Sequence, residues 1–448
     1  MWEDLFKESL RYAKDKLPSA GMVALGYNTN IDAVVRLDTK MIERYLEKEN
    51  VKEEEIRDML EKPKGKIKDV RDFLCGILYY MNSGGGGEWL IEDKGTFEWL
   101  DSNMKGEYKM GGNCGIMSNV LSNLGVKVIS HAISRCELQM RLYEGNNVYI
   151  ATENGLKSPV DAIRGEDERM VHYIIEFRKG DTISIGKSKI VSPSANRFIA
   201  TYDPANTRLD IDKSFRKEIV NNLDIIQSVI LTGYHLLNKT NYRDRIRESI
   251  NDILGWKRIK RDLLVHTEFA DIHDKEMLRY YVEMMGSVVD SVGMNEDELE
   301  SVCEVFERKM RDKHADTVFL NASWLFTRLG VKRLVVHTRK YSIALTKGNP
   351  EYERNALLFG CLGAATRAHK GNFSGIKDIE DTNVVLEIDE ESIKEEDRLN
   401  KVVKLDNGIG RFKNGKVIFS PVKYCENPVN TVGLGDCFTA CNIALISI

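Results

Sequence analysis

The sequence predicts an α/β fold, with a mainly parallel sheet flanked by helices and a second, smaller domain that is rich in strands. From residue 211 onward, short apolar segments alternate regularly with longer segments of helical period. This alternation is typical of a parallel sheet that is covered by helices on both faces. Residues 147–202 instead show strand-like alternation without helical segments, and a chain of 448 residues is long enough to bury both units.

The N-terminal part of the chain opens with a helical pattern over residues 1–17, where apolar residues are interleaved with charges. Two apolar runs at 22–25 and 31–37 flank a polar turn, and both are therefore expected to be strands. Residues 40–81 are heavily charged and have a helical period, which four glycines at 84–87 interrupt. This helical segment is expected to be an insertion after the second strand.

The later elements follow from the same signals. A Gly-Gly-Asn turn at 111–113 precedes a helix that ends at Gly125, before an expected strand at 126–133. A long helix is expected around 355–369, and the acidic segment 376–404 is expected at the surface. Further strands are expected at 228–232, 263–268, 287–292, 333–337 and 342–345.

The charge balance indicates a small-molecule partner. The chain has 65 Lys and Arg residues against 69 Asp and Glu, so no global positive field is available for nucleic acid or an anionic membrane. The longest markedly apolar run, residues 440–448, is far shorter than the ~20 residues of a membrane helix. Residues 1–17 do not have the pattern of a secretory signal, so a cytoplasmic protein is expected.

The clearest motif is Gly433-Leu434-Gly435-Asp436, which precedes an apolar helical segment. Glycines at the start of a helix allow backbone N–H groups to converge on an anion, and the helix dipole adds positive charge there. Asp436 could accept a proton from an alcohol that attacks phosphorus. Taken alone, the motif also fits a simple helix cap, and it is neither a P-loop nor a dinucleotide-binding fingerprint.

Two acidic residues follow expected strands of the sheet. Glu268 ends a strand at the edge where α/β sheets bind their ligands. Glu298 lies three residues after Asn295, a spacing close to a capping box, which needs no catalytic function. Together the two carboxylates could hold Mg²⁺, partly through its water ligands.

Polar side chains near the N-terminal strands are candidates for binding a sugar. Asn30 and Asp32 lie among apolar residues, and Gly112 and Asn113 open the helix after the Gly-Gly-Asn turn. Buried amides and carboxylates select hydroxyl groups, because leaving such a group unpaired is costly. Asx turns use the same residue types, so these positions alone do not establish a site.

The order of these motifs along nearly the whole chain resembles that of the ADP-dependent sugar kinases, the glucokinase and phosphofructokinase family best known from archaea. The resemblance includes Asn-Arg-Phe-Ile at 196–199 and the segments 266–270 and 432–436. It implies a ribokinase-like large domain and a smaller lid, which we expect at 1–37, 108–146 and 203–448, and at 38–107 and 147–202, respectively. The chain departs from the family in ending twelve residues after Asp436, so a short terminal helix is expected.

The resemblance also implies a reaction, in which the β-phosphoryl group of ADP passes to glucose, fructose 6-phosphate or both, releasing AMP. Asp436 would be the catalytic base, supported by Gly433 and Gly435, and Mg²⁺ would be held by Glu268, Glu298 and Asp436. The sugar-binding residues would be Asn30, Asp32, Glu88, Gly112 and Asn113, with Lys157 and Arg178 as candidates for a sugar phosphate. The nucleotide-binding residues would be Arg197, His337, Val432 and Gly433.

Glu88, directly after the four glycines, bears on the choice of sugar. In the resembling family a Glu at this position accompanies glucose use, and its presence beside basic residues predicts a bifunctional enzyme. The alternative is a surface Glu in a flexible loop. Two further alternatives remain for the whole chain, an ATP-dependent sugar kinase of the ribokinase type and a sugar-binding protein of the same fold without turnover.

Overall fold

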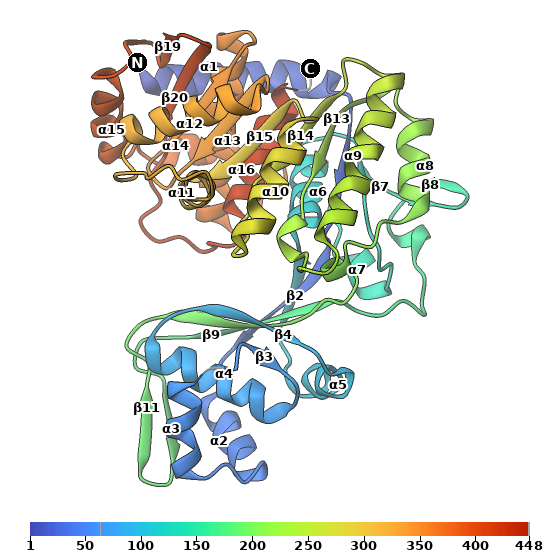
Figure 1. Ribbon diagram of the computed structural model, residues 1–448, viewed down its shortest axis with the longest axis vertical. Coiled ribbons are helices and arrows are strands. Elements are labelled where there is room, and N and C mark those ends of the chain that lie inside the picture. Colours follow the sequence, from blue (N-terminus) through green and yellow to red (C-terminus); the bar gives the residue numbers. More distant parts are fainter. Residues whose placement is uncertain (63, 447–448) are drawn as a thin grey trace.

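The protein, described here by a computed structural model of residues 1–62 and 64–446, contains two large β-sheets and a separate hairpin. Figure 1 shows the larger sheet and its helices in the upper part, with the smaller sheet and its helices below. Each sheet has its own hydrophobic core. No helix among the described residues is both long and apolar enough to cross a membrane.

The larger sheet has the strand order β18-β19-β20-β17-β16-β15-β14-β13-β1-β6-β7-β8. Its central strands, from β16 to β7 in that order, run parallel, and antiparallel strands complete both edges. The strands are β1 (Met22–Gly26), β6 (Val128–Ser130), β7 (Val148–Thr152), β8 (Gly155–Lys157), β13 (Ile226–Leu231), β14 (Leu264–Glu268), β15 (Ser291–Asn295), β16 (Arg333–His337), β17 (Tyr341–Thr346), β18 (Leu405–Asp406), β19 (Ile409–Phe412) and β20 (Gly415–Pro421). The predicted mainly parallel α/β sheet is therefore confirmed.

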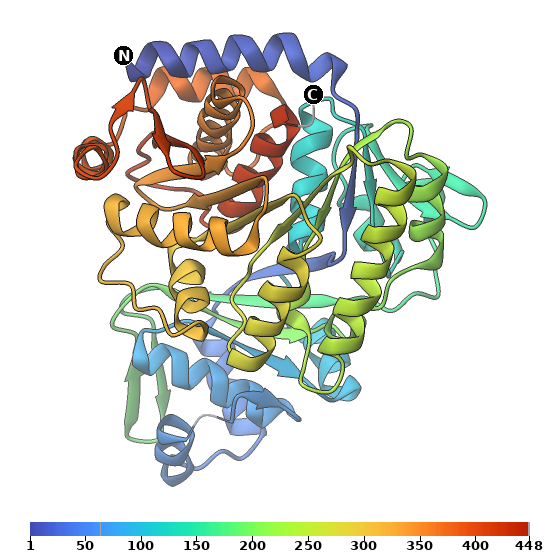
Figure 2. The ribbon, with the colours of Figure 1, turned by 45° about the horizontal axis from the view of Figure 1, so that its top comes forward.

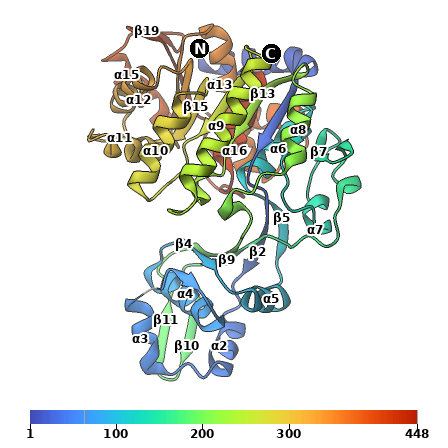
Figure 3. The same cartoon turned by 45° about the vertical axis from the view of Figure 1, so that its right-hand side comes forward.

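Helices cover both faces of this sheet, which explains why a strand such as β1 is buried at every position. Figure 3 shows α8, α9 and α10 in front of the sheet, with α6 and α16 behind it, and Figure 2 shows α1 running along one edge of the molecule. The helices of this unit are α1 (Trp2–Lys16), α6 (Asn113–Asn123), α7 (Glu137–Arg141), α8 (Lys213–Asn221), α9 (Tyr242–Ile259), α10 (Lys275–Gly286), α11 (Glu296–Val305), α12 (Ala315–Leu329), α13 (Pro350–Lys370), α14 (Ile376–Val385), α15 (Glu390–Asn400) and α16 (Leu434–Ile446), with 3₁₀ turns η1 (Leu17–Ser19), η2 (Val160–Ala162), η3 (Asn206–Arg208) and η4 (Tyr234–Leu236).

The smaller sheet has the order β3-β4-β12-β9-β2-β5, and β10 and β11 form the separate hairpin. Its strands are β2 (Asn30–Arg36), β3 (Lys66–Ile67), β4 (Gly87–Ile91), β5 (Glu107–Gly111), β9 (Val171–Phe177) and β12 (Asn196–Tyr202), and the hairpin strands are β10 (Thr182–Ile185) and β11 (Ser188–Val191). Helices α2 (Thr39–Lys48), α3 (Glu53–Glu61), α4 (Val70–Ser83) and α5 (Lys94–Asn103) accompany it. Aromatic side chains of α4, β4 and β12, including Phe73, Trp89 and Phe198, pack together in its core.

The two sheets depart in three places from the boundaries expected from the sequence. Strand β2 pairs with β5 and β9 of the smaller sheet, although residues up to 37 were expected in the large unit. Strand β5 belongs to the smaller sheet too, although residues 108–146 were expected in the large unit. Strands β7 and β8, expected in the small unit, extend the larger sheet through the parallel pairing of β7 with β6. All three errors have the same cause, since a strand pattern does not indicate which sheet the strand joins.

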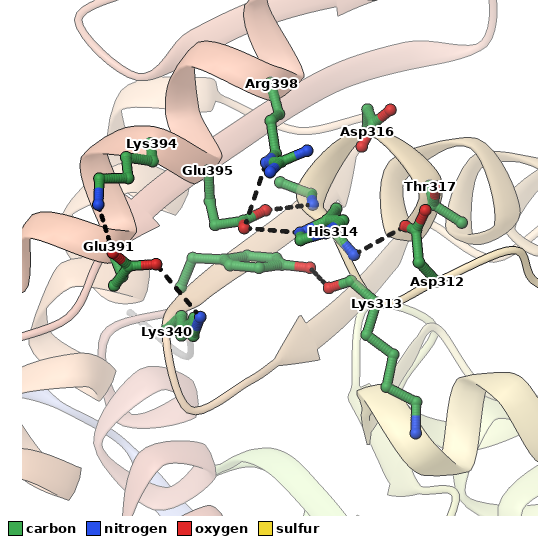
Figure 4. Close-up of polar contacts among 12 residues, drawn as sticks. Asp312, Lys313, His314, Asp316, Thr317, Lys340, Glu391, Lys394, Glu395 and Arg398 are labelled. Atoms are coloured by element: carbon green, nitrogen blue, oxygen red, sulfur yellow. Dashed lines mark hydrogen bonds and ion pairs between the residues drawn. The ribbon is translucent and has the colours of Figure 1, made fainter.

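Two smaller expectations were also inaccurate. The strand expected at 287–292 begins only at Ser291, because the backbone N–H groups of residues 288 and 289 still donate to Met285 in the turn after α10. The acidic segment 376–404 contains α14 and α15, and not all of it lies at the surface. Figure 4 shows Glu395 of α15 pointing at His314, and this buried carboxylate also accepts from the backbone N–H of Ala315.

Candidate active site

A cavity of about 190 Å³ is lined by strands of the smaller sheet and by helix and loop residues of the larger unit. Side chains reach it from strands of the smaller sheet, from the start of α6 and from the loop that leads into α16. Of the site residues expected from the sequence, those in the lining are Asn30, Asp32, Glu88, Gly112, Asn113, Arg197, Val432 and Asp436. Residues as far apart in the sequence as Asn30 and Asp436 thus converge on one pocket.

Asp436 lies in the first turn of α16, where the helix dipole and free N–H groups favour an anion. Its Oδ1 accepts a hydrogen bond of 2.6 Å from Nδ2 of Asn113. Burial raises the pKa of Asp436, while the hydrogen bond from Asn113 and the charge of Arg367 oppose that rise. A carboxylate with a raised pKa is a better proton acceptor than an ordinary Asp.

The loop before Asp436 requires glycine at one position for two reasons. Gly433 has a φ of +69°, which side chains with a Cβ rarely adopt, and a Cβ there would lie 2.8 Å from Cδ1 of Ile116. The absence of a side chain allows the loop to pack against α6. The backbone N–H groups that follow are thereby brought to the cavity edge next to Asp436.

Asp32 and Asn30 form the part of the cavity contributed by β2. Nδ2 of Asn30 donates to Oδ1 of Asp32 over 2.7 Å, whereas Oδ1 of Asn30 is buried without a partner. Burial raises the pKa of Asp32, and the neighbouring His172 opposes the rise. This strand therefore contributes one carboxylate and one buried, unpaired acceptor to the cavity lining.

Glu88 is fixed by β-structure and does not lie in a flexible loop. It is the second residue of β4, which pairs in parallel with β12, where Ile199 is its partner in the register. The hydroxyl of Thr201, also on β12, donates to Oε1 of Glu88. The second carboxylate oxygen of Glu88 is then available to a ligand in the cavity.

His172 is a lining residue that sequence reasoning missed. It lies on β9 directly opposite Asp32 of β2, and its Nε2 is 3.1 Å from Oδ2 of Asp203. Burial alone would lower its pKa, but Asp203, Glu88 and Asp32 outweigh that effect and raise the pKa to about 9. His172 is therefore positively charged at neutral pH and balances part of the negative charge in the cavity.

This charged histidine predicts a pH-dependent contribution to stability. Because the pKa of His172 in the folded protein lies above the ordinary value of 6.5, its contribution is complete below pH 6.5 and is lost as the pH rises through about 9. The advantage of the parent over His172→Gln in free energy of unfolding should fall by up to about 3 kcal/mol over this interval. Urea unfolding at pH 6 and pH 9.5 measures it, and a difference independent of pH would contradict the assignment.

Glu268 is the last residue of β14, and side chains from β14, α16 and β16 surround its carboxylate. Its Oε1 accepts from Nε2 of His266 over 2.7 Å and from the hydroxyl of Thr439 over 2.9 Å, and Nε2 of His337 is 3.9 Å from Oε2. Burial would raise the pKa of Glu268, but His266 and His337 outweigh it and hold the pKa well below its usual range. A Cβ on Gly435 would lie 3.1 Å from the His337 ring, so this cluster adjoins the glycine loop.

Glu298 forms the capping box that its spacing predicted. Its backbone N–H donates to Oδ1 of Asn295, and its Oε2 accepts from the backbone N–H of Asn295 over 2.7 Å. Burial also raises the pKa of Glu298 to about 8. The capping box therefore uses Oε2 of Glu298, and Oε1 takes no part in it.

The described residues contain no group of three or more His, Cys, Asp or Glu side chains that would form a metal cage. Mg²⁺ in phosphoryl-transfer enzymes is usually held by one or two carboxylates together with water and substrate phosphates. The charge of Glu268 is one of the causes of the raised pKa of Glu298, after the burial of Glu298 itself. The donor set therefore fits Mg²⁺ bound in this way.

Lys157 and Arg178 do not line the cavity, although both were candidates for binding a sugar phosphate. Lys157 ends β8, at the edge of the larger sheet. Arg178 is exposed just beyond β9, where its backbone N–H donates to Asp181. Both are basic residues of the strand-rich segment 147–202, and that segment is divided between the two sheets.

Arg367 contacts the loop before α16 and was also missed. It lies in the last turn of α13, and its Nε donates to the carbonyl oxygen of Val432 over 2.8 Å. A second nitrogen, Nη1, donates to Asn372 over 3.1 Å. In the sequence Arg367 resembles any basic residue at a helix C-terminus, so no local signal marks it.

Comparisons with known proteins agree with this geometry. The conserved region of ADP-specific phosphofructokinase/glucokinase matches residues 21–445. The chain is 34% identical over 450 residues to the ADP-dependent glucose/glucosamine kinase of Pyrococcus furiosus, with 97% of this chain and 96% of that protein covered. It is 29% identical over 443 residues to the ADP-specific phosphofructokinase of Thermococcus litoralis, with 93% and 94% covered.

Solved structures show the same relationship. The last common ancestor of ADP-dependent phosphofructokinases from Methanosarcinales matches with a TM-score of 0.86 and 28% identity, over 100% of this chain and 98% of that one. An ADP-dependent kinase in complex with fructose 6-phosphate and ADPbetaS matches with a TM-score of 0.82 and 26% identity, over the same shares. The large sheet with its flanking helices is thus the ribokinase-like fold, and the chain belongs to the ADP-specific phosphofructokinase/glucokinase family.

Proposed function

We propose that the chain is an ADP-dependent sugar kinase that transfers the β-phosphoryl group of ADP to an unphosphorylated hexose, with glucose as the preferred acceptor. The observation that carries the proposal is the position of Asp436. Its buried carboxylate shares one cavity with Asp32 and Glu88 and lies at the N-terminus of α16. A proton acceptor, groups that bind hydroxyls and a site for an anion thus meet at one point.

In the proposed reaction a sugar hydroxyl attacks the β-phosphorus of ADP. The new P–O bond forms as the bond to the α-phosphate oxygen breaks, AMP leaves, and the hydroxyl proton passes to the Asp436 carboxylate. Asn113 orients that carboxylate through its hydrogen bond to Oδ1. The amides of residues 433–436, the α16 dipole and Arg197 stabilise the phosphate charge, since positioning and electrostatics supply most of the rate in phosphoryl transfer.

Glu268 and Glu298 would hold Mg²⁺, which when bound neutralises charge on the phosphate oxygens. His266 and Thr439 fix the orientation of Glu268, and Asn295 fixes that of Glu298. These hydrogen bonds keep both carboxylates in place without the metal. Donors that fix the orientation of ligand residues are typical of metal sites.

Glu268→Gln and Glu298→Gln are expected to raise the Mg²⁺ concentration needed for half-maximal activity by roughly tenfold. Gln suits this position of a capping box, so Glu298→Gln should retain most of the stability of α11. Activity titrated with MgCl₂ and thermal unfolding measure the two effects separately. Asp297→Asn, one residue away and paired with the surface Lys313, is the control and should change neither. A lower melting temperature with unchanged Mg²⁺ dependence would leave Glu298 as a cap only.

The cavity favours an unphosphorylated acceptor. It contains the carboxylates of Asp32, Glu88 and Asp436, and its basic side chains are Arg197 and the two histidines His172 and His235. A sugar phosphate needs additional basic partners, which Lys157 and Arg178 do not supply from outside the lining. Fructose 6-phosphate remains the second candidate, because the similar kinase that was solved with this sugar shares the fold over the whole chain.

An activity matrix of ADP or ATP against glucose or fructose 6-phosphate tests the proposal. AMP formation with ADP and glucose is the expected result. Turnover with ATP alone would instead indicate an ATP-dependent enzyme of the same fold. Binding of glucose without AMP production under any combination would indicate a sugar-binding protein.

A further inference from the structure

Two polar atoms of the cavity lining are buried without a hydrogen-bond partner, Oδ1 of Asn30 and Nδ1 of His235. Unpaired buried polar atoms are rare, and each one calls for an explanation. Asn30 was expected to bind sugar from its place in the Asn/Asp-rich turn, whereas His235 belongs to no motif of the sequence. His235 therefore needs a partner of its own.

His235 lies in η4, directly after the central strand β13. The carboxyl ends of central strands are where open α/β sheets bind their ligands. Burial lowers the pKa of His235, and Glu88 and His172 are among the charged groups that act on it. At neutral pH the ring is therefore uncharged, and Nδ1 can donate or accept one hydrogen bond according to its tautomer.

The acidic groups of the cavity cannot donate hydrogen bonds to a ligand, and a ring nitrogen can. Asp32, Glu88 and Asp436 each use one carboxylate oxygen on a donor of the protein and keep the other for a ligand. These acids can accept from sugar hydroxyls but cannot donate to them. A hydroxyl bound in a buried site also accepts a hydrogen bond, so a donor near the end of β13 would complement the acids and add to the donors Arg197 and His172.

We propose that Nδ1 of His235 binds one hydroxyl group of the acceptor sugar and thereby helps to select the sugar. The inference rests on the proposed function, because it takes the cavity as the site of the phosphoryl acceptor. A polyol ligand with a hydroxyl near the end of β13 would satisfy this nitrogen. The competing explanation is an ordered water molecule that satisfies Nδ1 without contributing to specificity.

Three substitutions test which ring nitrogen matters. The amide of Asn corresponds in position to Nδ1 of His, and the amide of Gln corresponds to Nε2. His235→Phe and His235→Gln should each lower kcat/KM for glucose by roughly tenfold to a hundredfold, with KM for ADP unchanged. His235→Asn should retain most of the parental value. Equal losses in all three variants, or a loss in none, would overturn the assignment.

Monodeoxy glucoses identify the bonded hydroxyl. With the one analogue that lacks this hydroxyl, the parent and His235→Phe should have the same kcat/KM, because neither protein can form the hydrogen bond. An equal defect with every analogue would show that Nδ1 serves a structural water only. Calorimetric titration of glucose onto the parent and the variant gives the same comparison without turnover.

His131→Phe is the matched control. His131 is also buried, but its Nδ1 lies 2.6 Å from the carbonyl oxygen of Tyr27 and its Nε2 accepts from the backbone N–H of Asp212. Its loss should lower the melting temperature without changing the choice among sugars. If the parent forms no AMP with any sugar, the proposed function fails, and glucose titration still tests His235. If the parent phosphorylates glucose and His235→Phe binds it equally well, only this inference fails.

Discussion

Asp436→Asn is expected to lower kcat by about 100 to 10,000-fold, the usual contribution of a general base. The amide has the shape of the carboxylate and can still contact Asn113, but it cannot accept the hydroxyl proton. Sugar and nucleotide binding should remain measurable, because neither requires that transfer. In the parent, the raised pKa of Asp436 also implies that kcat/KM begins to fall at a higher pH than for an ordinary Asp when the solution is acidified.

Steady-state kinetics together with AMP binding by calorimetry separate loss of chemistry from loss of structure. Asp290→Asn is a suitable control, since Asp290 is buried but precedes β15 and lies outside the cavity lining. It should lose stability, because Lys257 and Lys332 lose their partner, yet retain kcat in the folded fraction. A rate above half the parental value in Asp436→Asn would exclude the role of base.

The site residues that the sequence predicts all belong to short motifs, in which the spacing of a few neighbouring residues indicates a turn or the start of a helix. The glycines before Asp436, the Asn295 and Glu298 pair and the Gly-Gly-Asn turn each form a turn or helix start that short segments encode. The parallel sheet could be predicted for a similar reason, because strands buried on both faces give continuous apolar runs.

The residues that were missed reach the cavity through tertiary structure. His172 is placed there by the register of β9 against β2, and His235 by the end of a central strand. Arg367 reaches the glycine loop from a helix that begins 17 residues earlier at Pro350. These contacts join segments that are far apart in the sequence, so no short motif predicts them. Strand β2 lies in the smaller sheet, and Lys157 lies outside the cavity lining, because neighbours in the sequence are not always neighbours in space.

Glu88→Ala is expected to remove most glucose phosphorylation while affecting fructose 6-phosphate far less. A carboxylate held on β4 by Thr201 can accept hydrogen bonds from glucose hydroxyls, and the loss of one such charged bond corresponds to ~1.5 to 3 kcal/mol. Specificity for glucose, measured as kcat/KM, should therefore fall roughly tenfold to a hundredfold. For a phosphorylated sugar the carboxylate adds only repulsion at the phosphate.

The two sugars must be compared in the same preparations to make this prediction decisive. Glu92→Ala is the matched control, because Glu92 directly follows the same strand but pairs with the surface Lys66 and lies outside the cavity lining. It should leave both activities unchanged. Glu88→Gln should fall between the parent and Glu88→Ala, since an amide oxygen still accepts but carries no charge. Equal losses on both sugars in Glu88→Ala would mean that Glu88 supports the fold of β4 against β12 rather than the choice of acceptor, and the preference for glucose would then rest on Asp32 and the two histidines.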